Sequence, residues 1–159
     1  MTRTTPDAPA TPTLGAMLAQ VHEPWAAQVR LVLGPATDPQ ASFWTRWGAA
    51  RFLGDQFARR FRAECALMDE LEGLVPSRAV ARLEAARAEI DRAAAELRNV
   101  GRRRGVAQVM AELSTLFVAA LAHWWAEVES ATANLDQTDL PPSARRRLTR
   151  LLAVDAVAS

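Results

Sequence analysis

The strongest constraint on the fold of this 159-residue chain is the segment LFVAALAHWWA at residues 116–126, in which His123 is the only polar side chain. If this segment is helical, every face of the helix is apolar, which is typical of a helix at the centre of a bundle. A membrane-crossing helix needs about 20 apolar residues, whereas ordinary amphipathic sequence flanks this shorter run. We therefore expect it to form the core of a water-soluble protein without a transmembrane segment.

The composition favours helices over strands. Ala and Leu are abundant, Ile occurs once and Tyr is absent, which is typical of an all-α fold. A chain of this length can bury one core, so we expect a single domain over residues 14–156. Residues 1–13 are rich in Thr and Pro and have little to bury, which predicts a disordered N-terminal tail.

Cys65 is the only cysteine, and this start of the chain has no apolar core of the kind a signal peptide needs, so we expect a cytoplasmic protein.

Apolar periodicity predicts an antiparallel helical bundle of four main helices plus a short C-terminal helix. The C-terminal helix should begin at Pro141 or Pro142. Pro24 should kink or divide the first helix. The GRRRG segment at residues 101–105 favours a turn between the third and fourth helices, although a continuous helix, and so an elongated molecule, stays open. The four main helices are expected at about residues 14–33, 39–74, 77–100 and 106–135.

The long second helix has a seam with alternating four- and three-residue steps, which is the spacing of a heptad. In this seam Gly54 should allow a close approach of another helix. Glu64 should need a partner or solvent, because a carboxylate on a core stripe is costly to bury alone. The seam consists of Phe43, Trp47, Ala50, Gly54, Phe57, Phe61, Glu64, Met68 and Leu71.

The aromatic residues exceed what one seam requires. Trp124 lies on the core stripe of the fourth helix, and Trp125 is rotated about 100° from it, so one of the two must leave the main core line. We expect Trp44 and Trp125 to be buried against another subunit. The alternative is a pocket for a small apolar ligand between the second and fourth helices. That pocket would be lined by Trp47, Phe57, Phe61, Phe117, His123 and Trp124.

A metal site is the weakest of the alternatives. His123 and Glu127 are four residues apart and share a helix face, and Glu64 of the second helix could complete a set of three ligands. Di-iron bundles need Glu-x-x-His pairs on two helices, and this chain has no such pair. We therefore expect no metal and no other cofactor.

Charge argues against a nucleic-acid partner. All 19 basic residues are Arg, but 18 acidic residues nearly cancel them and leave a net charge of +1. Consecutive arginines on a helix point about 100° apart, so they form no continuous basic stripe. There is also no phosphate-binding loop and no Ser, His and acid set at a diagnostic spacing.

The sequence predicts a non-enzymatic helical interaction protein that forms a homo-oligomer through its aromatic surface. The small-molecule-binding bundle is the alternative, and a metal-dependent enzyme using Glu64, His123 and Glu127 is the weaker one.

Overall fold

The computed structural model describes residues 12–103 and 107–156, and within these ranges the chain forms helices and loops without a strand. The all-α prediction is confirmed. The helix boundaries differ from the expected ones, because the second helix is interrupted. The elements in chain order are α1 (Leu14–Ala36), α2 (Phe43–Phe52), a π-helical turn (Leu53–Phe57), α3 (Ala58–Leu71), a 3-10 turn (Glu72–Leu74), α4 (Ser77–Gly101), α5 (Ala107–Thr132), a second 3-10 turn (Gln137–Asp139) and α6 (Pro142–Ala156).

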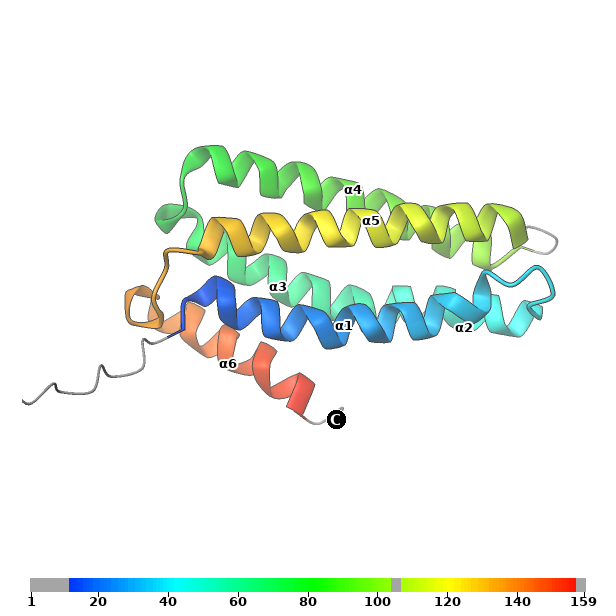
Figure 1. Ribbon diagram of the computed structural model, residues 1–159, viewed down its shortest axis with the longest axis horizontal. Helices are drawn as coiled ribbons and strands as arrows, with labels where there is room; N and C mark the ends of the chain where they lie inside the picture. Colours follow the sequence, from blue (N-terminus) through cyan, green and yellow to red (C-terminus); the bar gives the residue numbers. More distant parts are fainter. Residues whose placement is uncertain (1–11, 104–106, 157–159) are drawn as a thin grey trace, which may run out of the picture.

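The long helices lie lengthwise beside one another (Figure 1). α5 packs against α4 on one side and against α1 on the other, while α2 contacts both α1 and α4. Figure 1 shows that helices that follow one another along the chain run in opposite directions, with α2 and α3 forming one interrupted rod. α6 lies outside this group and packs mainly on α3.

α1 runs through Pro24 as a single helix, so of the kink or division expected there, the division does not occur. The Thr13 side chain accepts a hydrogen bond from the Ala16 amide and caps the first turn. Val21 and Trp25, on either side of the proline, are both buried in the core. Their burial favours continuing the helix despite the lost backbone donor.

The second helix begins at Phe43, four residues later than expected. The Ser42 hydroxyl accepts a hydrogen bond from the Thr45 amide and so caps α2. The Asp38 carboxylate accepts a hydrogen bond from the Gln40 amide in the preceding turn.

Close helix approach occurs at two other glycines and not at Gly54. A Cβ at Gly54 would meet only the Arg98 side chain, at an ordinary 3.6 Å. A Cβ at Gly15 would lie 2.7 Å from the Glu129 carbonyl oxygen, so α1 and α5 touch there through their backbones. A Cβ at Gly101 would lie 2.9 Å from that of Ala50, where α4 meets α2.

α4 ends at Gly101, and Arg102 and Arg103 form the start of a turn. Because α5 returns along α4, the two helices are not continuous. Gly105 and the predicted start of the fourth helix at Val106 lie outside the described residues, as does almost all of the predicted tail at residues 1–13.

α5 buries one face, contrary to the expectation that residues 116–126 would be enclosed on every side. Leu116 is 60% exposed. Within the described residues, α5 alone has the length and mean hydropathy, 1.3, that crossing a membrane requires, and 28% of that apolar stretch is buried. Core helices of water-soluble proteins share this composition, and the absence of a transmembrane segment stays a prediction. The buried seam consists of Met110, Ser114, Phe117, Leu121, Trp124 and Val128.

Candidate functional site

A buried polar cluster joins α1, α3 and α5. His22 of α1 is 4% exposed and lies between two carboxylates. Its Nδ1 is 2.8 Å from Oε1 of Glu129, and its Nε2 is 3.3 Å from Oε1 of Glu64. The indole Nε1–H of Trp124 donates to the same Glu64 oxygen at 2.7 Å. Glu64 therefore has the partners that its place on a core stripe requires.

Aromatic rings close this cluster. Trp125 stacks on the His22 ring, with a centroid separation of 5.0 Å and an interplanar angle of 14°. On the other side of Glu64, Phe61 meets the Trp124 ring edge to face at 5.3 Å. The Glu64 side of the cluster is therefore shielded from solvent, which strengthens the hydrogen bond from Trp124, whereas the Glu129 side chain is 38% exposed.

The core aromatics fill the space in which a ligand pocket was expected. Phe57 contacts Phe61 at 5.6 Å and Phe117 at 5.0 Å between ring centroids. The space left beside Trp125 and these rings is about 10 Å³, enough for roughly one water and far below the several hundred Å³ of a typical small-molecule site. Four of the six expected lining residues thus pack against one another.

The other two expected lining residues lie elsewhere. Trp47 is on α2 and is 37% exposed. His123 is on the solvent side of α5, where its Nδ1 is 3.3 Å from Glu89 and its Nε2 is 3.7 Å from Glu127.

The three residues weighed as metal ligands do not converge. Glu64 is buried and bound to His22 and Trp124, whereas His123 is exposed on α5. The Glu127 carboxylate accepts from Nε of Arg82 at 2.6 Å. Among the described residues, no group of three or more His, Cys, Asp or Glu side chains is arranged to hold a metal ion.

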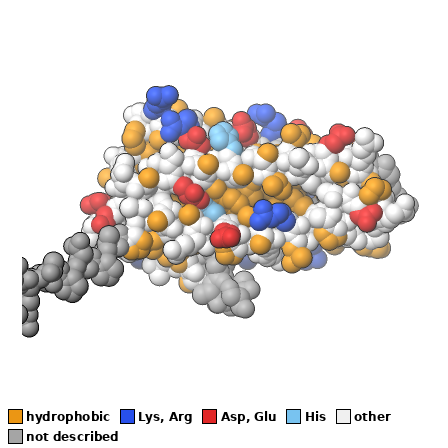
Figure 2. All heavy atoms as spheres, viewed as in Figure 1, with side chains coloured by type: hydrophobic (Ala, Val, Ile, Leu, Met, Phe, Trp, Pro, Cys, Tyr) orange, Lys and Arg blue, Asp and Glu red, His pale blue; other side chains and the backbone are white. Residues whose placement is uncertain are grey.

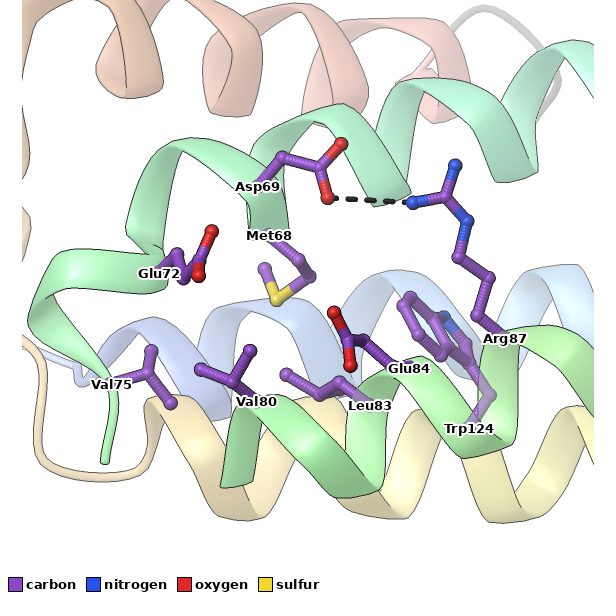
Figure 3. A pocket seen from close by; sticks show the side chains of 9 residues that line it. All are labelled: Met68, Asp69, Glu72, Val75, Val80, Leu83, Glu84, Arg87 and Trp124. Carbon is purple, nitrogen blue, oxygen red and sulfur yellow. Dashed lines mark hydrogen bonds and ion pairs between the residues drawn. The ribbon is translucent and has the colours of Figure 1, made fainter. Parts of the chain in front are cut away.

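A small cavity lies where the end of α3 meets the start of α4 (Figure 3). It has a volume of about 50 Å³, and Met68, Leu83 and the ring of Trp124 form its apolar walls. An ion pair of 3.4 Å between Asp69 and Arg87 spans one side of it. The volume suits a few water molecules at most.

An exposed aromatic cluster lies at the start of α2. Trp44 is 71% exposed and contacts Phe43 and Trp47 edge to face, at 5.3 and 6.1 Å between centroids. The Arg51 guanidinium lies 5.7 Å from the Trp47 ring, a cation–π distance. We call Phe43, Trp44 and Trp47 the α2 aromatic cluster. Trp125, which the sequence predicted to lie in an interface like Trp44, is half-buried against His22.

Sequence reasoning missed His22 as a member of the polar cluster. The available signal was its position four residues after Leu18 and three before Trp25, which places it beside the apolar stripe of α1. That spacing indicates burial, but it does not identify the two glutamates that lie on other helices. No family model, curated protein or solved structure matches this chain.

Proposed function

We propose that this protein is a non-enzymatic helical interaction protein, an antiparallel bundle of four main helices that forms a homo-oligomer through the α2 aromatic cluster. The observation that carries the proposal is the 71% exposure of Trp44 in contact with two further aromatic rings. Aromatic side chains on a surface bury a large apolar area when a partner covers them, and Trp is enriched among the residues that dominate binding energy.

The polar cluster supports a structural role more than a catalytic one. Trp124 donates to Glu64, His22 contacts Glu129 and lies 3.3 Å from Glu64, and aromatic rings pack on His22 and Trp124. The adjoining space of about 10 Å³ leaves no room for a substrate among these described residues. Surface contact is therefore the better supported activity.

Analytical ultracentrifugation over a range of concentrations tests this proposal. The wild type should be a dimer or larger, and Trp44→Ala should raise the dissociation constant by roughly tenfold or more, as expected for a central aromatic anchor. Leu31→Ala is the matched control, because Leu31 is 76% exposed on α1 and outside the cluster. A wild type that stays monomeric, or a Trp44→Ala variant that associates like the wild type, would overturn the proposal.

A further inference from the structure

α5 carries a second, largely apolar seam beside its buried one, in which Val109 and Leu116 are exposed, whereas Leu113 and Ala120 are half-buried against the core. Each residue of the second seam precedes a residue of the buried seam by one position, so the second seam is rotated by about 100° around the helix. It keeps the same alternation of four- and three-residue steps. This second seam explains why residues 116–126 are apolar all round although α5 is not enclosed. It consists of Val109, Leu113, Leu116, Ala120, His123 and Glu127.

The second seam faces a groove between α4 and α5. The groove has a volume of about 440 Å³ and an apolar floor that includes Leu113, Leu116 and Ala120. Glu89, Arg92 and Glu96 of α4 line its other side. Figure 2 shows acidic and basic side chains interspersed with hydrophobic ones along this edge of the molecule. A row of apolar side chains beside a charged rim is an arrangement on which another helical surface can pack.

Charge favours a protein partner over a lipid surface. α5 contains no basic residue, and the α4 side of the groove adds two carboxylates and one guanidinium. Helices that lie on membranes have basic polar faces, because the lipid surface is negative. Among the described residues, Arg92 and Glu96 have no ion-pair partner within the chain, so they are available to a second molecule.

The pairing of α4 with α5 fixes how a second copy would fit. Glu89 on α4 contacts His123 on α5. Because the two helices run in opposite directions, five residues further along α4 and five residues back along α5 place Ala94 and Val118 at the same level along the helix axes. A two-fold axis crossing both helices at this height would place α4 against α4 and α5 against α5. A residue two positions before the axis in one copy would then meet the residue two positions after the axis in the other copy.

We propose that the groove between α4 and α5 is a second self-association surface, on which another copy of the chain packs about this two-fold axis. Leu116 of each copy packs against Ala120 of the other, so a large side chain meets a small one twice. Arg92 of each copy pairs with Glu96 of the other. This surface is distinct from the α2 aromatic cluster and does not rest on it.

The decisive experiment mixes two charge variants, each in a Trp44→Ala background that removes the contribution of the α2 aromatic cluster. In a dimer of Arg92→Glu, two negative charges face each other, at residue 92 of one copy and residue 96 of the other. In a dimer of Glu96→Arg, two positive charges face each other at the same two positions. Each variant alone should therefore have a dissociation constant raised by roughly tenfold or more. An equimolar mixture should form heterodimers with wild-type affinity, because both cross-pairs are then opposite in charge. Native mass spectrometry distinguishes the heterodimer by mass.

A cross-linking measurement supports the geometry independently. Ala119 is exposed and lies one residue from the axis, so Ala119→Cys should cross-link to its counterpart with a short bis-maleimide. Gln20→Cys on the exposed side of α1 is the control and should give no cross-linked dimer. Cys65 does not compete, because it is buried and burial raises its thiol pKa to about 12.

A mixture that forms no more dimer than either charge variant alone would overturn the proposal, as would equal cross-linking of the two cysteine variants. Neither result depends on Trp44. Smaller assemblies in Trp44→Ala than in the wild type, together with heterodimer formation in the mixture, would support both surfaces. Wild-type association in Trp44→Ala with heterodimer formation would leave the groove alone as the interface.

Discussion

At the scale of single residues, Glu64 shows how a costly group is accommodated in a helical core. Its carboxylate is almost fully buried, yet it accepts a hydrogen bond from Trp124 and lies 3.3 Å from Nε2 of His22. The partners come from α5 and α1, so this one side chain ties three helices together. Removing the Glu64 carboxylate leaves the buried indole N–H of Trp124 without its acceptor.

Glu64→Leu should lower the free energy of unfolding by about 1–3 kcal/mol, because the buried Trp124 indole N–H loses its acceptor. Glu64→Gln should cost less, since an amide oxygen can still accept from Trp124. Urea denaturation followed by circular dichroism measures both. Glu72→Gln, at an exposed position beyond α3, is the control and should match the wild type. Equal stability of all three variants would show that the cluster does not stabilise the fold.

The need for a partner at Glu64 follows from the sequence, but the identity of the partner does not. The heptad seam places Glu64 among apolar residues, and burying a carboxylate there requires compensation. His22 is 42 residues earlier and Trp124 is 60 residues later in the chain. Which of the two histidines faces inward depends on the rotation of α1 and α5, and that rotation is set by packing.

At the scale of elements, the helices follow from apolar periodicity, whereas their interruptions follow from local geometry. The π-helical turn at Leu53–Phe57 inserts an extra residue between α2 and α3. Phe52, Leu53 and Phe57 are all buried around it. The sequence does not predict this insertion. The apolar residues of the second helix keep a uniform alternation of four- and three-residue steps, and such a repeat predicts an uninterrupted helix.

Glycines within helices should respond to substitution in opposite directions, according to what surrounds them. Gly15→Ala should destabilise the protein by about 1–3 kcal/mol, because the new Cβ meets backbone atoms of Glu129 and Ala133 that cannot move aside. Gly48→Ala in α2 should stabilise it by about 1 kcal/mol, because nothing lies within 4 Å and Ala favours the helix. The thermal unfolding midpoint reports both. A Gly15→Ala variant as stable as the wild type would contradict the close contact of α1 with α5.

At the scale of the whole molecule, the two proposed surfaces would make each copy bivalent. The α2 aromatic cluster lies near one end of the molecule, and the groove runs along the middle of α4 and α5. Two such self-association surfaces on one copy would together generate assemblies larger than a dimer. Blocking one surface should leave dimers held by the other.

The attachment of α6 to the rest of the molecule should depend on pH. The Arg147 side chain of α6 donates to the Glu70 carboxylate of α3, and this hydrogen bond holds the pKa of Glu70 below its ordinary value of 4.5. α6 is also held by Arg60, which donates to the Leu151 carbonyl at 3.2 Å. Glu70 is thus the acid-sensitive part of this contact.

A carboxylate whose pKa is lowered by folding stabilises the folded state fully above its ordinary pKa, and this contribution is lost as the pH falls through the lowered value. The thermal midpoint of the wild type should therefore fall more steeply below pH 4.5 than that of Glu70→Gln, which has no proton to gain at this position. Circular dichroism melts between about pH 3 and 7 make the comparison, with Glu72→Gln as the control. Parallel curves for the wild type and Glu70→Gln would show that the contact of α6 with α3 does not depend on this ion pair. α6 would then be held by the burial of Leu148 and Leu151 and by the hydrogen bond from Arg60 to the Leu151 carbonyl.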